Sequence, residues 1–94
     1  MKTTKELKCL FNNQKSFYGK AEVEQEENNV TLISYNIPIV NVNNGKITPL
    51  WDGYSATANR HLKEFFKQFW DVEYSKEAWD KIQAGEIKTI KDLR

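Results

Sequence analysis

Apolar side chains near the N-terminus recur at helical spacing. Thr3 and Glu6 have the spacing of a capping box, in which each side chain satisfies the backbone of the other residue. Leu7, Leu10 and Phe11 then follow at i, i+3 and i+4, which is typical of one face of an amphipathic helix. The pattern predicts a short N-terminal helix that stops at the following pair of asparagines. Because so short a helix is only marginally stable in isolation, its apolar stripe must pack against the rest of the chain.

From Phe17 the apolar period changes to two, as in a half-buried strand. Strands are expected over 17–24, 30–35, 37–42 and 47–51. Asn43-Asn44-Gly45 predicts a tight hairpin turn, because Asn and Gly tolerate positive φ. Pro38, close to Asn36, indicates a break or bulge, and Pro49 indicates an edge strand, because proline cannot donate to a ladder. Short turns between successive strands favour an antiparallel meander.

Helical spacing returns in the second half of the chain. Ser55 is a suitable N-cap for a helix that runs to about Trp70. Its apolar face is formed by Ala58, Leu62, Phe65, Phe66 and Phe69. Ser75 predicts the cap of a further helix that carries Trp79 and Ile82, and Gly85 is placed to end it. Thr89 is placed to cap a last short turn.

The order of these elements predicts an α+β fold in a single domain over 1–94. We expect a four-stranded antiparallel sheet, with the main helix packed on one face and short N- and C-terminal helices as supports. This layering gives every apolar face a partner. The aromatic content of 13% suggests a core built on a few large rings.

Charge and cysteine usage narrow the classes of function and compartment. The formal net charge is +1, from 14 basic and 13 acidic residues, so a strong general attraction to nucleic acid is not expected. The single cysteine, Cys9, allows no internal disulfide and favours a reducing compartment. The polar N-terminus does not have the pattern of a signal peptide, and no stretch is apolar enough for a membrane span. We therefore expect a cytoplasmic protein.

No constellation in the sequence predicts catalysis. His61 is the only histidine, and a hydrolase triad needs a nucleophile, a base and an acid in contact. The nearby hydroxyls of Ser55 and Thr57 are better explained as groups that bond the backbone at a helix start. One His and one Cys give too few ligands for zinc, and the glycines lie too far apart for a phosphate loop. We expect a protein that is not an enzyme and has no cofactor and no metal.

An acidic run lies around the first predicted turn and is a candidate partner-binding patch. It contains Glu22, Glu24, Glu26 and Glu27, of which the first three alternate along a strand. The functional interpretation is a docking surface for a basic protein, such as one whose groove normally holds nucleic acid. The alternative is a solvated hairpin whose charge protects the sheet edge.

A basic stripe is the alternative candidate. Arg60, Lys63 and Lys67 lie on one side of the main helix and could contact phosphates or an acidic protein. They could equally form the solvated side of an amphipathic helix, with Glu64 placed to pair with Arg60.

Aromatic residues that remain exposed are a third candidate, because such residues often anchor binding. Tyr18, Tyr54 and Trp79 are the candidates for this role, and core packing is the alternative for each of them.

Several short segments carry a resemblance to a known group of proteins. They are Phe17-Tyr18, Ser34-Tyr35-Asn36, Trp51, Tyr54-Ser55-Ala56-Thr57, Arg60-His61 and Glu64-Phe65. Over 15–69 the chain resembles short uncharacterised proteins encoded by phages and mobile elements of low-GC Gram-positive bacteria. This group more often has a second threonine where Ala58 stands. The resemblance implies a small accessory protein of a mobile genome, a class that includes anti-CRISPR proteins and other inhibitors of host defences.

Two functions remain open at this point. The first is a protein-binding inhibitor of a host protein, for example a defence nuclease. The second is a nucleic-acid-associated accessory protein that uses the Arg60, Lys63 and Lys67 face. The oligomeric state is left open.

Overall fold

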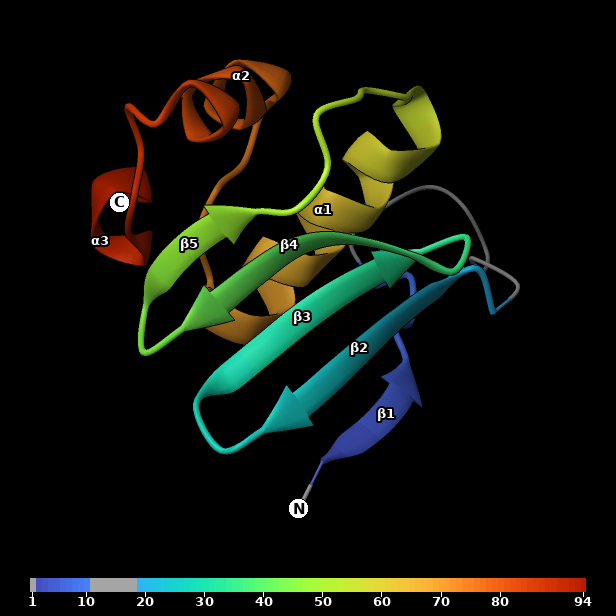
Figure 1. Ribbon diagram of the computed structural model, residues 1–94. Coiled ribbons are helices and arrows are strands. Elements are labelled where there is room, and N and C mark those ends of the chain that lie inside the picture. Colours follow the sequence, from blue (N-terminus) through green and yellow to red (C-terminus); the bar gives the residue numbers. More distant parts are fainter. Residues whose placement is uncertain (1, 11–18) are drawn as a thin grey trace.

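The computed structural model describes residues 2–10 and 19–94. The elements are β1 (Thr3–Glu6), β2 (Ala21–Glu26), β3 (Asn29–Ser34), β4 (Ile37–Asn43), β5 (Lys46–Pro49), α1 (Ala56–Trp70), α2 (Lys76–Ala84) and α3 (Ile90–Leu93). The strands form one antiparallel sheet in the order β1-β2-β3-β4-β5. Helix α1 crosses one face of this sheet, and α2 and α3 lie beside β5 (Figure 1). The predicted α+β class is confirmed, but the sheet has five strands instead of four.

The fifth strand is the N-terminal segment, for which the prediction of a helix was wrong. Thr3–Glu6 pairs with β2, with Thr3 opposite Gln25 and Glu6 opposite Glu22. A helix this short is marginal in water, whereas the edge of β2 offers a full row of backbone partners. Leu7 is buried, whereas Leu10 is 63% exposed, so the expected apolar stripe does not dock as a unit. Its third member, Phe11, lies outside the described residues.

The predicted meander is confirmed over β2 to β5, with some changes at the strand ends. β2 begins at Ala21, and the part of the predicted strand at Phe17 and Tyr18 lies outside the described residues. Tyr35 and Asn36 form the turn after β3, both with positive φ (51° and 66°). The Asn44-Gly45 turn also has positive φ at both positions, as the sequence predicted.

The irregularity expected near Pro38 is a β-bulge in β4. Leu32 pairs with Val40 and Ile33 pairs with Pro38, so Ile39 is an extra residue on its strand. In consequence the adjacent side chains of Ile39 and Val40 are both buried. A bulge of this kind also increases the local twist of the sheet.

The helix boundaries follow the predicted caps. The hydroxyl of Ser55 accepts a hydrogen bond from Ala58 N (3.0 Å), and that of Ser75 accepts one from Ala78 N (3.3 Å). Gly85 ends α2 in the left-handed conformation (φ 81°). Thr89 begins α3 with a capping box completed by Asp92. Each cap satisfies backbone groups that a helix end otherwise leaves without partners.

The core lies between the inner face of the sheet and the helices. From the sheet it takes the inward side chains of β2, β3 and β4, and from α1 it takes Leu62, Phe65 and Phe66. Trp79 and Ile82 of α2 are also fully covered. The sheet is thereby held against the helices on one face, and no helix of the described residues lies on its other face (Figure 1).

The edge position predicted for Pro49 is confirmed, because β5 is the last strand of the sheet. Ile47 N donates to Lys88 O (2.7 Å), and Ile90 N donates to Gly45 O (2.8 Å). The backbone groups of successive residues alternate in direction along an antiparallel strand, so position 49 also faces outward. Proline has no N–H to leave open there, which is a common way to protect a sheet edge. In the described residues, no helix is long and apolar enough to cross a membrane.

Candidate binding surface

The sheet face opposite α1 is a broad surface formed by the outward side chains of the strands. No helix of the described ranges lies on it (Figure 1). Its residues alternate with the buried ones, so Ala21 and Val23 of β2 face the core while Glu22, Glu24 and Glu26 face outward. The strand register aligns one complete polar row across the face: Thr4, Glu24, Thr31, Asn41 and Thr48. This outward surface is called the open face below.

Carboxylates gather on the β1–β2 side of the open face. Glu6 of β1 lies directly opposite Glu22 of β2, on the same side of the sheet. Like charges directly opposite each other destabilise a strand pair, so this arrangement has a cost in the isolated chain. Lys2 lies 3.6 Å from Glu24, but the Lys2 side chain is 60% exposed, so this ion pair offsets little of the cost.

The structure brings together most of the predicted acidic patch. Glu22, Glu24 and Glu26 share the open face, and Glu27 stands beside them in the β2–β3 turn with a φ of 55°. Glu6 is the member that the sequence did not reveal, because the helix predicted for this segment separated it from β2. Its only signal was the alternation of Lys2, Thr4 and Glu6, which is too short to indicate a strand.

The β3–β4 part of the open face is polar and internally bonded. The amide of Asn41 donates to Asn29 Oδ1 (2.6 Å) and to Thr31 Oγ1 (2.9 Å). These bonds join β3 to β4 on the surface and hold the side chains in fixed positions. The acidic half is therefore supported by a preorganised polar surface.

The basic stripe of α1 has less free charge than the sequence suggested. Arg60 and Lys63 are exposed, but Lys67 pairs with Asp71 (2.9 Å) and with Glu73 (3.1 Å). The hydrogen bonds that Lys67 Nζ donates to these two carboxylates raise the pKa of Lys67. The two carboxylates offset the positive charge of the lysine and thus weaken a phosphate-binding role for this stripe.

Glu64 lies on the covered side of α1, where the prediction did not place it. The prediction paired it with Arg60, but its carboxylate is fully buried and accepts hydrogen bonds from Leu10 N (2.9 Å) and Gln68 Nε2 (2.7 Å). It thereby anchors the segment that follows β1 against α1. Buried carboxylates persist where such hydrogen bonds compensate for lost hydration.

His61 is buried beside a hydroxyl that the sequence did not indicate. Its Nδ1 lies 2.7 Å from Ser34 Oγ, and the ring of Tyr35 stacks on it with centroids 6.1 Å apart. Burial, followed by the nearby charge of Arg60, lowers the pKa of His61 from 6.5 to about 4. Serine and imidazole are therefore in contact, with the imidazole neutral at pH 7.

The contact between Ser34 and His61 favours a structural role. The two residues are only 4% and 1% exposed. A serine nucleophile must reach the carbonyl of its substrate, and burial of both groups works against that approach. The hydrogen bond instead joins the end of β3 to α1 through two polar groups that are satisfied by each other.

The aromatic candidates have different positions. The proposal that Trp79 is an exposed anchor is wrong: it is fully buried, and its Nε1 donates to Gly53 O (3.1 Å). Tyr54 is 48% exposed, with Lys76 Nζ 5.0 Å from the centre of its ring. Tyr18 lies outside the described residues. Only Tyr54 is therefore placed by the structure as an accessible aromatic group among the three.

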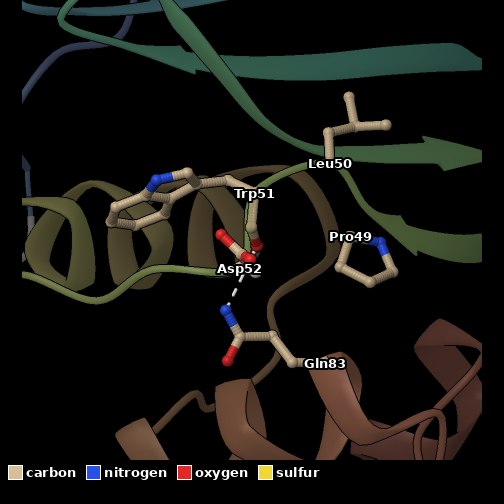
Figure 2. Close-up of a pocket in the computed structure, with 5 residues that line it drawn as sticks. All are labelled: Pro49, Leu50, Trp51, Asp52 and Gln83. Atoms are coloured by element: carbon tan, nitrogen blue, oxygen red, sulfur yellow. Dashed lines mark hydrogen bonds between the residues drawn. The ribbon is translucent and has the colours of Figure 1, made fainter.

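A surface hollow lies where the chain leaves β5 (Figure 2). Its lining consists of Pro49, Leu50, Trp51, Asp52 and Gln83. Gln83 Nε2 donates to Trp51 O (3.1 Å) and to Gly53 O (3.0 Å), which fixes this loop to α2. In Figure 2 the side chains of Leu50 and Trp51 point in different directions, so the lining does not converge on one point. The hollow offers a single carboxylate, and across the described part of the chain no group of three His, Cys, Asp or Glu residues could hold a metal ion.

Comparison with known proteins places the chain in a family. A family of unknown function, DUF8033, matches residues 5–81. The chain belongs to DUF8033. The matched range starts within β1 and ends within α2, so it includes β2 to β5, which form most of the open face of this DUF8033 protein, and α1, which packs on the opposite face. No curated protein and no solved structure matches the chain.

Proposed function

We propose that this DUF8033 protein acts by protein binding and not by catalysis, through the acidic half of its open face. In this proposal it is a small accessory protein of a phage or other mobile element and works in the host cytoplasm. It inhibits a host defence system by covering a basic surface of one of the proteins of that system, such as the nucleic-acid groove of a nuclease. The opposed carboxylates of Glu6 and Glu22 carry the proposal.

The argument rests on electrostatic complementarity. Glu6, Glu22, Glu24 and Glu26 lie side by side on two paired strands and face outward together. A basic partner would remove the mutual repulsion of these groups at the moment of binding, so it would gain more than it would from isolated carboxylates. Grooves that hold nucleic acid are lined with Lys and Arg, so they offer the opposite pattern.

The rigidity of the sheet adds to this argument. Strand β2, which carries three of the carboxylates, is paired with a strand on each side. The inner side chains of β2 are buried against the core. Binding therefore requires little ordering of the backbone, which is one of the main costs of association. An inhibitor that blocks a surface depends on this kind of preorganisation.

The test compares two variants that have the same change in net charge. Glu22→Gln with Glu24→Gln neutralises the centre of the acidic half, and Glu77→Gln with Glu86→Gln neutralises two exposed glutamates in α2 and directly after it. Each purified protein is immobilised and exposed to lysate of a low-GC Gram-positive host, and captured proteins are measured by quantitative mass spectrometry. A captured protein is then purified and titrated against all three chains at two salt concentrations.

We expect one host protein with a basic surface to bind the wild type and the Glu77/Glu86 variant equally. Binding of this protein to the Glu22/Glu24 variant should be at least about tenfold weaker, as for loss of two charged contacts. In cells, the wild type should raise the plating efficiency of a phage that the host defence restricts, and the Glu22/Glu24 variant should not. Equal binding by both variants would contradict the acidic-face proposal.

A further inference from the structure

The two edges of the sheet are treated differently by this fold. The β5 edge is covered by the segment that leads into α3 and carries Pro49 at an outward position. The β1 edge has no such protection in the described residues, and all four residues of β1 are exposed. An open strand edge is a template for pairing with another strand.

The hydrogen-bonding groups of this edge can be assigned from one observed bond. Leu7 N donates to Ala21 O (2.9 Å), so position 7 faces β2. Because the groups alternate along an antiparallel strand, Thr3 and Lys5 also face β2. The N–H and C=O groups of Lys2, Thr4 and Glu6 therefore point outward, away from the sheet.

A second copy of the same edge fits these groups in one register. If two β1 strands meet antiparallel with Thr4 opposite Thr4, Lys2 of each copy lies opposite Glu6 of the other. All of these residues have outward backbone groups, so each opposed pair exchanges two hydrogen bonds. Lys2, Thr4 and Glu6 also share the open face, as the pairing of Thr4 with Glu24 and of Glu6 with Glu22 shows. Each lysine is thus placed to form an ion pair across the two-fold axis.

The neighbouring registers are less favourable for identifiable reasons. Centring the pairing on Lys5 places two lysines opposite each other, which destabilises a strand pair. Centring it on Thr3 removes Glu6 from the pairing and leaves Lys2 opposite Thr4. The sequence of the edge therefore selects the register centred on Thr4, by opposite charges and by the larger number of backbone bonds.

We propose that β1 is a self-association edge, on which a second copy of this chain docks in the register centred on Thr4. The two sheets then form one continuous antiparallel sheet with two-fold symmetry, which is the usual symmetry of soluble dimers. Lys2 of the second copy is placed beside Glu6, so the repulsion between Glu6 and Glu22 is reduced. The open faces of the two copies become one surface, which can present acidic patches to two sites of a partner at once.

This proposal does not depend on the partner suggested above, because it is tested on the purified chain alone. Two four-residue strands bury much less than the ~1,600 Å² of a standard interface, so the association is weak. The measurement is sedimentation velocity from micromolar to millimolar concentration, in reducing buffer so that Cys9 cannot form an intermolecular disulfide. We expect the weight-average mass to rise from monomer to dimer over this range.

Thr4→Pro is the sharpest variant, because it removes an N–H that points away from the monomer sheet. We expect it to weaken dimerisation at least about thirtyfold, from the loss of two hydrogen bonds per dimer. Thr4→Val keeps the N–H and is the matched control, with a dissociation constant within about threefold of that of the wild type. Circular dichroism and the urea midpoint should show that both variants remain folded.

The charge pairs are tested by reversal and rescue. Lys2→Glu alone and Glu6→Lys alone should each weaken dimerisation, and the double variant should restore it, because it exchanges the two charges across the axis. A wild-type chain that stays monomeric at millimolar concentration would overturn the proposal and would leave the edge to a strand of another protein. A Thr4→Pro chain that dimerises as well as the wild type, or a double variant without rescue, would overturn it also.

Discussion

Buried polar side chains hold the ends of this fold in position. Ser34 and His61 join β3 to α1, and Glu64 joins α1 to the segment after β1. Each of them is placed by the core around it, and each is satisfied by hydrogen bonds and not by solvent. Substitution of a buried polar side chain in this fold is therefore expected to change the free energy of unfolding.

The buried imidazole gives a prediction for acid stability. The pKa of His61 is lowered from 6.5 to about 4 by burial, so the unfolded chain takes up a proton over this range and the folded chain does not. The free energy of unfolding should fall as the pH drops from 6.5 towards 4, by at most about 3 kcal/mol from this residue. His61→Gln, which can still bond Ser34, should lose that part of the slope. Urea unfolding at intervals between pH 7 and pH 4.5 measures the difference, and equal slopes for the two proteins would contradict it.

Tyr74 gives a prediction of the opposite sign, because removal of its buried hydroxyl should raise the free energy of unfolding. Its hydroxyl is buried with no hydrogen-bond partner among the described residues, and its ring stacks on Phe66 with centroids 5.5 Å apart. Burial also raises the pKa of the Tyr74 hydroxyl. Tyr74→Phe keeps the ring and removes the unsatisfied group, so the free energy of unfolding should rise by about 1 kcal/mol. Phe66→Leu, which disturbs the same stack without removing a polar group, should lower it. Urea unfolding of both variants is the measurement, and a destabilised Tyr74→Phe protein would contradict the argument.

At the scale of elements, the hairpin turns and the caps decide where strands and helices end. Gly45 follows Asn44 in a two-residue turn and has a φ of 82°, a backbone conformation that residues other than glycine rarely adopt. Its carbonyl also accepts the bond from Ile90 N that holds the start of α3. This turn therefore connects the β4–β5 hairpin with the C-terminal helix.

Gly45→Ala should lower the free energy of unfolding by about 1 kcal/mol, from backbone strain alone. Apart from Gly45 and its two chain neighbours, no atom of the described residues lies within 4 Å of an added Cβ, so a steric clash with the rest of the fold does not contribute. The control is Asn28→Ala, in the β2–β3 turn, which should change the stability by less than about 0.5 kcal/mol as an exposed substitution. Chemical denaturation of both variants measures the two changes. Equal destabilisation would indicate that the left-handed conformation at Gly45 has no special cost.

At the scale of the whole molecule, the described residues leave one face and one edge of the sheet open and cover the opposite face and edge. The inner face is packed against α1, and β5 is covered by the segment before α3. The local stability of each strand should depend on this arrangement. The backbone hydrogen bonds of a strand open least often when the strand is paired on both sides and buried on one face. The β1 edge, which is paired on one side alone among the described residues, is therefore the least protected part of the sheet.

Hydrogen exchange should show this order directly. Amides of β3, which pairs with β2 and β4, should exchange slowest, and those of Thr4 and Glu6 in β1 should exchange fastest among the strands. The N–H groups of Thr4 and Glu6 point outward, so raising the protein concentration should slow their exchange if the dimer forms. Exchange of Leu7, whose N–H is bonded to Ala21 O, serves as the internal control. Slow exchange of Thr4 and Glu6 at low concentration would contradict the assignment of these groups as outward.

Local chemistry made most of the elements predictable. The Asn44-Gly45 turn, the caps at Ser55, Ser75 and Thr89, and the edge position of Pro49 each depend on groups within a few residues of one another. The hydroxyl caps and the left-handed turn are favoured in any fold that contains these segments. The α+β class follows from their order, and three acidic members of the open face follow from their alternation in β2.

The rest was decided by contacts between segments far apart in the chain. The sequence by itself indicates a helix at residues 3–11, but the edge of β2 converts Thr3–Glu6 into a strand and brings Glu6 opposite Glu22. In the same way, Ser34 meets His61 only because β3 packs under α1. Propensity and spacing describe neighbours along the chain, whereas backbone pairing and burial are settled by whichever distant segment supplies the missing partners.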